Sequence, residues 1–567
     1  MKKNKVALAV LTCLAGISSA QTVPDAGALL NQYKQESAQK QDAAAPVQEG
    51  RAQVFKGFGF VDLTAEQEQQ ARQITQAYVG QEVIPDALIK YLEMQMERRH
   101  GISLVFVPLP DGQLKAIRPV LGAIHIDNQS KLSDALLRRT LTQGIETGQA
   151  LNRMALEARS MVANEIPGVV HQYRMVPGTA VGSTDLQVTT TDAKPADGYW
   201  GFDSNGTTAV GIWQAMIGFS VNNAMGAGER LSLHALQTQN GQYVGLQAEA
   251  PVRVNDLRVG LSASHYGYDY ATSGTSQNGT ALISNYLGGA RAVGLNAHYA
   301  LTRSEFERSH LSLALDRKEN HSDADIHATA FDGSTQTANY RLSNWLIESV
   351  STGYHRMAAL PNRARVSYGL TASYGNARQQ NESAALADTN AARQQGRYAK
   401  FHLHTEYAQP WRLSQHDLVF TASAAGQWSD KNLPNSEKFT VGGLSMMKAW
   451  SPQVTSGDQA VWLELKLEKY IQPHLKLGLF AEVAQIKAQH TPYGALAPDR
   501  TAVWLDDKNT LSDVGVMATY SPQPSMELVG SLAVKTSGEP KAYKMPIAST
   551  NKQHGDVMGF VRLMYRF

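Results

Sequence analysis

The sequence lacks several features that would place it in common protein classes. It has one cysteine, Cys13, among 567 residues, and that residue lies in the apolar N-terminal stretch. We therefore expect a mature chain without thiols, disulfide bonds or cysteine-based metal sites. No later segment has about 18 consecutive apolar residues, which argues against a membrane-spanning helix. A net charge of only +2 argues against a nucleic-acid partner.

Motifs of enzymatic chemistry are also missing. The sequence has no Gly-Lys-Ser/Thr nucleotide loop, no His-Glu-x-x-His zinc motif and no Gly-x-Ser-x-Gly elbow. Its 16 histidines are scattered. His402 and His404 share one face of a predicted strand and could bind a metal ion, but two polar wall residues are the simpler interpretation. We expect no enzyme, no cofactor and no metal site.

The N-terminus is organised as an export signal. Lys2, Lys3 and Lys5 precede a short apolar core, and Ser18-Ser19-Ala20 forms a small-residue cleavage site. Residues 1–20 are predicted to be a signal peptide, so that the mature chain begins at Gln21.

The C-terminal residues alternate in polarity, as a half-lipid-exposed strand requires. Val561, Leu563, Tyr565 and Phe567 lie on one face, and Phe560, Arg562, Met564 and Arg566 on the other. With an export signal, this pattern predicts the closing strand of an outer-membrane β-barrel, with Tyr565 and Phe567 as its C-terminal signal.

Sixteen such segments follow about residue 197, which predicts an all-β transmembrane barrel of 16 antiparallel strands over residues 197–567. The predicted strands are 197–204, 213–222, 229–238, 242–251, 256–268, 289–301, 307–318, 338–354, 364–375, 397–408, 416–427, 459–470, 475–487, 511–520, 525–535 and 556–567. A lumen lysine or arginine turned toward mid-bilayer lipid would cost about 2–4 kcal/mol, so the register is well specified. A soluble β-sandwich would not explain the export signal, the terminal aromatic residue and the loop lengths together.

The predicted connections differ in length at the two ends of the barrel. Tight turns are expected at 252–255, 471–474 and 521–524. Long loops are expected at 269–288, 376–396, 428–458, 488–510 and 536–555. Short periplasmic turns and long extracellular loops are typical of outer-membrane barrels in Gram-negative bacteria, and an even strand count leaves both ends of the barrel domain on the periplasmic side.

Residues 21–196 have a different pattern. A helix with Leu29, Leu30 and Tyr33 on one side is predicted at 24–40 and a linker at 41–51. A strand-helix-helix-strand-strand pattern then occurs twice. The first copy covers 54–63, 65–79, 85–100, 102–109 and 113–119, and the second covers 122–127, 131–141, 150–165, 169–176 and 184–191. We expect two periplasmic α+β modules, at 52–120 and 121–196, with sheet edges that can accept an extended peptide.

These features resemble the two-partner-secretion transporters (TpsB) of the filamentous-haemagglutinin and haemolysin exporter type, within the superfamily of outer-membrane barrel insertases and translocases. The resemblance covers nearly the whole mature chain. Val23-Pro24-Asp25-Ala26-Gly27 resembles the start of the family's plug helix, and the two repeats resemble its polypeptide-transport-associated (POTRA) modules. Phe439-Thr440-Val441-Gly442-Gly443 resembles the start of its long, inward-folding sixth loop, predicted here at about 428–458.

The sequence departs from the family at the tip of that loop. The family's Val-Arg-Gly-Tyr is Met447-Lys448-Ala449-Trp450 here, and its Phe-x-Asp-x-Gly is Phe480-Ala481-Glu482-Val483-Ala484. The family pairs the arginine with the aspartate. The resemblance therefore implies a lock between Lys448 and Glu482, with Trp450 and Phe480 beside it, although lysine cannot form arginine's two-pronged contact.

The resemblance implies a secretion function. The family captures an unfolded exoprotein, such as an adhesin, a haemolysin or a contact-dependent toxin, and exports it without nucleotide hydrolysis. Outer-membrane lipid and the barrel assembly machinery are the other implied partners. An assembly factor that inserts other barrels, a passive pore or receptor, and a divergent, weakly active member stay open as alternatives.

Overall fold

A computed structural model describes residues 53–567, except 181, 276–279, 331, 414–415, 497–501, 505–507 and 539–556. The predicted signal peptide, the predicted plug helix with Leu29, Leu30 and Tyr33, and the linker lie outside the described residues. Within the described part, no helix is long and apolar enough to span a membrane.

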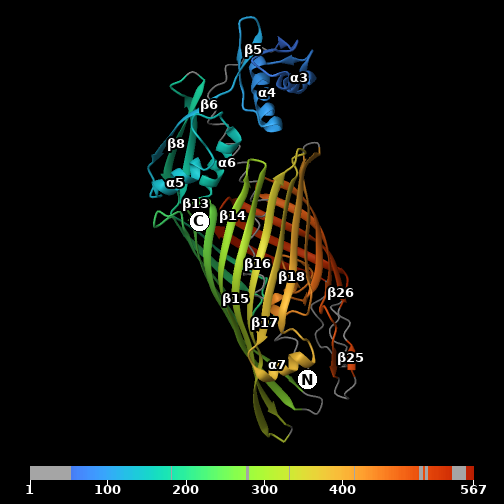
Figure 1. The fold of residues 1–567 in the computed structure, drawn as a ribbon. Coiled ribbons are helices and arrows are strands. Elements are labelled where there is room, and N and C mark those ends of the chain that lie inside the picture. Colours follow the sequence, from blue (N-terminus) through green and yellow to red (C-terminus); the bar gives the residue numbers. More distant parts are fainter. Residues whose placement is uncertain are drawn as a thin grey trace.

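Sixteen antiparallel strands form a closed barrel (Figure 1), which confirms the predicted fold class. They are β9 (Ala196–Asp203), β10 (Gln214–Asn222), β11 (Arg230–Gln237), β12 (Gly241–Val252), β13 (Val254–Thr275), β14 (Ala281–Arg303), β15 (Glu307–Thr329), β16 (Thr335–Ala359), β17 (Arg365–Gln379), β18 (Gly396–Leu413), β19 (His416–Ser429), β22 (Gln459–Gln472), β23 (Leu475–Lys487), β26 (Lys508–Gln523), β27 (Met526–Ser537) and β28 (Val557–Arg566). The first and last strands close the barrel, with Tyr565 opposite Trp200.

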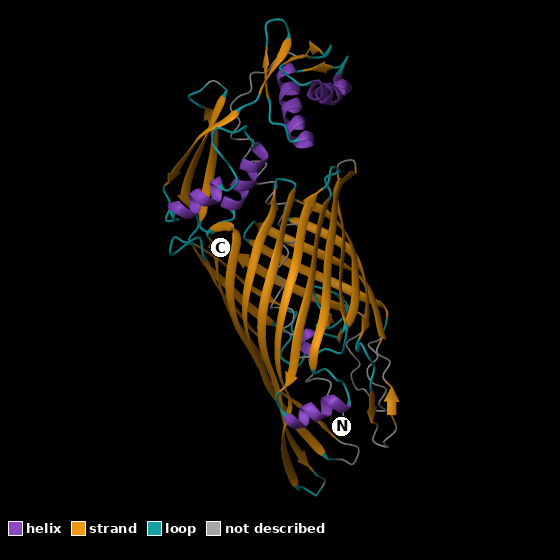
Figure 2. Ribbon diagram, in the orientation of Figure 1, coloured by secondary structure: helices purple, strands orange, loops and turns teal. Residues whose placement is uncertain are grey.

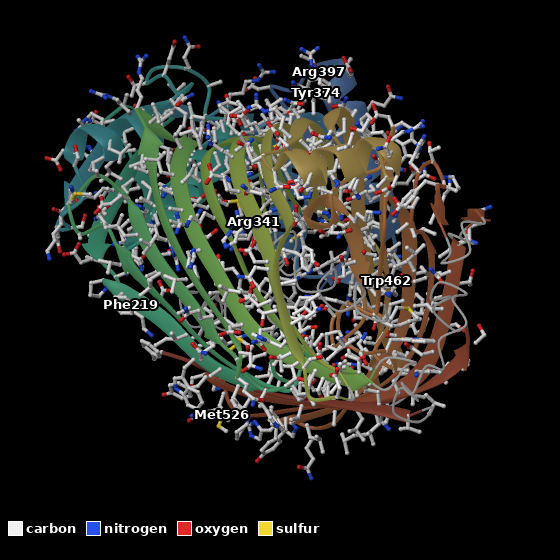
Figure 3. All side chains as sticks on the ribbon, turned by 90° about the horizontal axis from the view of Figure 1, so that it is seen from below. Phe219, Arg341, Tyr374, Arg397, Trp462 and Met526 are labelled. Atoms are coloured by element: carbon white, nitrogen blue, oxygen red, sulfur yellow. The ribbon has the colours of Figure 1, made fainter. Side chains whose placement is uncertain are left out.

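The alternation of side chains follows the sequence prediction. On β22, Val461, Leu463 and Leu465 are exposed on the outer surface, whereas Trp462 and Glu464 are buried. Figure 3 shows Phe219 and Met526 on the outside of the barrel and Trp462 on its inside. Apolar residues therefore face lipid, and the charged residues between them face the lumen.

One predicted long loop is a continuation of two paired strands. The predicted loop 269–288 is wrong, because β13 and β14 stay paired from Asp269↔Leu287 to Thr275↔Ala281. The paired strands β13–β16 extend well beyond the neighbouring strands at one end of the barrel (Figure 1). Beyond the bilayer, lipid no longer enforces strict alternation, so the pattern used to delimit strands ends before the strands do.

The other predicted loops also contain structure. The segment 376–396 includes α7 (Glu382–Asn390), and 488–510 includes β24 (Gly494–Leu496) and β25 (Ala502–Trp504). Most of 536–555 lies outside the described residues. The three predicted tight turns are confirmed, because each of these strand pairs is joined by only a few residues.

Two α+β units precede the barrel (Figure 2). The first contains β1 (Gln53–Val54), β2 (Gly59–Val61), α3 (Ala65–Thr75), η2 (Gln76–Tyr78), β3 (Glu82–Val83), α4 (Pro85–His100), β4 (Val105–Pro108) and β5 (Gln113–Ile117). The second contains β6 (Val120–Asn128), α5 (Asp134–Thr142), α6 (Arg153–Asn164), β7 (Val169–Pro177) and β8 (Ser183–Asp192). The predicted single strand 54–63 is wrong: it is two short strands, β1 and β2, and β1 pairs with the unpredicted β3.

Each unit has a three-stranded sheet covered by two helices. The sheet orders are β2-β5-β4 and β6-β8-β7, so each repeat ends with two adjacent antiparallel strands. Separate apolar cores form around Leu92 and Met96 in the first unit and around Leu137 and Val188 in the second.

The second unit is attached to the barrel rim by partly buried ion pairs and a hydrogen bond. Arg159 of α6 donates two hydrogen bonds, of 2.7 and 2.5 Å, to Asp256 of β13. Arg303 of β14 contacts Glu165 at 2.6 Å, and Asn255 Nδ2 donates to the Val162 carbonyl at 2.7 Å. Figure 1 shows α5 and α6 beside the end of β13, opposite the barrel end that carries α7.

Candidate gating loop in the barrel lumen

The connection between β19 and β22 is long, as predicted, and its middle is buried. It contains η3 (Asn435–Glu437), β20 (Phe439–Val441) and β21 (Thr455–Gly457). Strands β20 and β21 pair with each other and not with the barrel wall. Phe439, Val441, Met447 and Trp450 share an apolar cluster with wall residues that include Trp462 and Phe480. The loop therefore lies inside the barrel, packed against one wall.

Two glycines allow the chain to turn toward the loop tip. Gly442 and Gly443 have φ angles of 116° and 93°, a region that residues with a Cβ rarely adopt. A Cβ at Gly442 would lie 2.1 Å from the Ser451 carbonyl oxygen. The glycines predicted at the loop start thus occupy positions that need glycine.

The loop tip is bound to wall carboxylates mainly through its backbone. The amides of Met447 and Lys448 donate to the two Glu482 oxygens at 2.9 and 2.8 Å, and the Ala449 amide donates to Asp513 Oδ2 at 3.0 Å. Met447 has a φ of 60°, and this left-handed turn aims consecutive amides at neighbouring acceptors. Trp462 Nε1 also donates to Glu482 Oε1, at 3.1 Å.

The Lys448 side chain lies between two glutamates. Its Nζ is 2.6 Å from Glu464 Oε1 and 3.2 Å from Glu482 Oε1. It also lies 4.7 Å from the centre of the Phe480 ring, and Lys535 Nζ lies 4.6 Å from the Trp450 ring. Lys448, Trp450, Phe480 and Glu482 are therefore brought together, all of them buried.

Sequence reasoning missed Glu464 and Asp513. Both are directly opposite Glu482 on the neighbouring strands, so three acidic residues form a row across β22, β23 and β26. The alternation of apolar and polar residues at 461–465 places Glu464 on the lumen face, and this pattern could have identified it from the sequence. The strand register, which the sequence did not provide, brings all three to the loop tip.

The other predicted site residues lie elsewhere. Tyr565 stacks on Trp200 with ring centres 5.8 Å apart, and the Phe567 amide donates to the Gly198 carbonyl at the barrel seam. The rings of His402 and His404 are 6.2 Å apart. Among the residues that the structure describes, no group of three or more histidine, cysteine or acidic side chains could hold a metal ion.

Solved structures share this architecture. CdiB from Escherichia coli matches with a TM-score of 0.59 at 16% identity, over 97% of this chain and 100% of that chain. CdiB from Acinetobacter baumannii matches with a TM-score of 0.58 at 16% identity, over 95% of this chain and 98% of that chain. At this identity the likeness shows the fold.

The sequence relatives are also distant. The chain is 22% identical over 438 residues to the heme/hemopexin transporter protein HuxB of Haemophilus influenzae, over 74% of this chain and 72% of that protein. It is 23% identical over 402 residues to the outer membrane transporter CdiB of Dickeya dadantii, over 69% of this chain and 66% of that protein.

The family model for haemolysin secretion/activation proteins ShlB/FhaC/HecB matches residues 182–495. The match includes thirteen of the barrel strands, which are β9–β19, β22 and β23. It also contains the whole inward-folded loop and its contacts with Glu464 and Glu482, whereas Asp513 lies beyond the matched residues. Because this is more than half of the chain, the protein belongs to the ShlB/FhaC/HecB family of outer-membrane transporters.

Proposed function

We propose that this transporter exports one large partner exoprotein from the periplasm, and that the Lys448 tip bound to Glu482 keeps the loop in the lumen at rest. Family membership establishes an outer-membrane transporter of Gram-negative bacteria for partner exoproteins. The lock is inferred from the contacts that Glu482 makes with two consecutive loop amides, the Lys448 ammonium and the Trp462 indole.

The Lys448 side chain is only one of several groups that hold the loop at Glu482. In a pair formed by one arginine and one aspartate, the arginine side chain would supply most of the contact. Buried hydrogen bonds to a charged acceptor contribute roughly 1.5–3 kcal/mol each, and two of those at Glu482 come from the loop backbone. Lysine supplies a point charge that lies between Glu464 and Glu482, in place of a planar fork on one carboxylate.

Capture of the partner is assigned to the two periplasmic units. Their outer strands are β2 and β4 in the first sheet and β6 and β7 in the second. An extended segment of an unfolded exoprotein can add to such an edge through main-chain hydrogen bonds. The partner is proposed only as a large exported protein. The heme/hemopexin named for HuxB is said of that relative and not of this chain.

Export is proposed to need no nucleotide. The partner would pass through the barrel unfolded and fold at the cell surface, which would prevent its return. Displacement of the predicted plug helix at 24–40 would be a gating step, together with release of the loop tip.

Charge substitutions at the lock test this proposal. We expect Lys448→Glu and Glu482→Lys each to raise the basal conductance of the purified protein in planar bilayers at least threefold and to alter partner secretion. The exchanged pair should stay defective, because a lysine at 482 cannot accept the two loop amides. Lys476→Gln is the matched control, since Lys476 pairs with Glu468 between two wall strands at 3.0 Å. The lock is wrong if Lys448→Glu, Glu482→Lys and the exchanged pair all conduct and secrete as the wild type does.

A further inference from the structure

A second buried ion cluster holds the base of the loop. Glu437, in η3, has one carboxylate oxygen 3.0 Å from Lys318 Nζ of β15 and the other 2.7 Å from Lys400 Nζ of β18. The Glu437 side chain is 1% exposed. The base is therefore held by a different set of wall strands from β22, β23 and β26, which hold the tip.

Neighbouring contacts fix the same segment. Asn320 Nδ2 donates to Ser436 Oγ at 2.9 Å, and Gln427 Nε2 donates to the Glu437 carbonyl at 3.0 Å. Leu433 is fully buried in a cluster that includes Trp345 and Tyr398. Polar and apolar contacts to β15, β16, β18 and β19 thus converge on the few residues from Leu433 to Glu437.

Charge balance distinguishes the base from the tip. At the base, one carboxylate meets two ammonium groups, and both of its oxygens are paired. At the tip, Glu464, Glu482 and Asp513 lie opposite one another in register, with Lys448 in ion-pair contact with only the first two. Asp513 Oδ1 is buried without a hydrogen-bond partner among the described residues. Like charges placed directly opposite on adjacent strands destabilise each other.

Release of the tip removes the Lys448 cation from this row of carboxylates, so their mutual repulsion must then be screened by water. When the loop amides leave, water in the lumen can solvate the three carboxylates, whereas release of the base would separate a carboxylate from two paired cations. Breaking a well-paired buried cluster is the more costly step.

We propose that the Glu437–Lys318–Lys400 cluster is a fixed anchor, about which the loop tip moves while the base stays on the wall during export. Glu437 is then a positioning residue for the gating loop. This inference rests on the proposed lock at Glu482, and it adds which part of the loop moves and which does not.

Site-specific crosslinking tests the anchor directly. Because Cys13 is the only cysteine and lies in the predicted signal peptide, introduced cysteine pairs have no competing thiol in the mature chain. One pair, N320C with S436C, joins the base to β15, and the other, A449C with D513C, joins the tip to β26. A short bis-methanethiosulfonate reagent crosslinks each pair, and reducing agent reverses it.

Secretion of the partner is compared before crosslinking, after it and after reversal. We expect the crosslinked base to secrete within twofold of its uncrosslinked form, and the crosslinked tip to lose at least tenfold until it is reduced. Loss of secretion on crosslinking the base, or retention of secretion on crosslinking the tip, overturns the proposal.

A conductance measurement keeps the anchor testable without any partner. Glu437→Gln should raise basal conductance at least threefold, while Lys476→Gln, in a wall-to-wall pair, should not. An unchanged conductance for Glu437→Gln contradicts the anchor whether or not the chain exports a partner. A failure of the wild-type chain to export any partner contradicts the proposed function. The anchor can still be tested in that case, because the conductance measurement needs no partner.

Discussion

Glu482 accepts a 2.8 Å hydrogen bond from the backbone amide of Lys448, and it also lies 3.2 Å from the ammonium group of the same residue. The two contacts make different demands on the sequence. The ammonium contact needs a cation at position 448, whereas the amide contact needs only an acceptor at position 482.

Substitutions on the two sides of this contact should therefore differ. Glu482→Ala removes the acceptor of two loop amides, the Lys448 ammonium and the Trp462 indole, and breaking such a buried cluster costs about 3–5 kcal/mol. Lys448→Ala keeps the amide contacts. We predict a clearly larger rise in basal bilayer conductance for Glu482→Ala than for Lys448→Ala. Equal effects would mean that the side-chain ion pair alone holds the loop.

The turn at Gly442 should not tolerate a side chain. Gly442→Ala places a Cβ against the Ser451 carbonyl in a positive-φ conformation, so the β20–β21 hairpin must distort. We predict higher conductance and faster protease cleavage of the loop in detergent. Gly530→Ala is the control, because a Cβ there meets nothing within 4 Å. Wild-type behaviour of Gly442→Ala would show that the hairpin turn does not position the tip.

The second periplasmic unit should loosen from the barrel when its rim contact is removed. Arg159→Ala leaves Asp256, which is almost fully buried, without its two-pronged partner, at a cost of about 3–5 kcal/mol. Hydrogen exchange of the full-length protein should then show faster exchange in α6 and the β12–β13 turn. Arg72→Ala, which removes an exposed pair with Glu68 in the first unit, should leave both regions unchanged.

Acid should weaken the second unit through His171. Burial lowers the pKa of His171 to about 4, partly offset by its hydrogen bond to the Ala163 carbonyl. A carbonyl can only accept, so in the neutral ring Nε2 donates to Ala163 and Nδ1 accepts from Thr190 Oγ1. Protonation on Nδ1 would reverse the second contact, so that the ring donates to the Thr190 hydroxyl, and it would place a positive charge in a buried site.

The direction of the pH effect follows from that shift. The unfolded chain binds the proton near pH 6.5 and the folded unit only near 4, so the stabilisation is complete above 6.5 and is lost as the pH falls toward 4. The loss amounts to about 3 kcal/mol at about 1.4 kcal/mol per pKa unit. Hydrogen exchange of β7 and β8, corrected for intrinsic rates, should be faster at pH 4.5 than at pH 7. His171→Gln should remove most of that difference.

The sequence was sufficient for the barrel strands within the membrane, because lipid enforces alternation there. It failed where that constraint ends: β13 and β14 continue as a pair beyond residue 268, and α7 lies in a predicted loop. In the first periplasmic unit, β1 and β2 are separate because residues 55–58 leave the extended conformation at Gly57, which has a positive φ.

The candidate site was predicted only in part. The resemblance indicated Lys448 and Glu482. The apolar residues Leu477, Leu479 and Val483 lie at alternate positions of one strand, so that Glu482 falls on its inward face. Glu464, Asp513 and the Glu437 anchor depend on strand register and on the path of the loop through the lumen, which local patterns do not contain.

Export of a partner protein can be followed in a secretion assay. A strain lacking this chain receives the wild-type chain or a version without residues 52–192, together with a candidate large exported partner protein. We predict that the partner reaches the surface or medium only with the full-length chain, while the truncated barrel still inserts. Equal export without the chain, accompanied by failure of other barrels to assemble, would contradict it and favour an assembly factor.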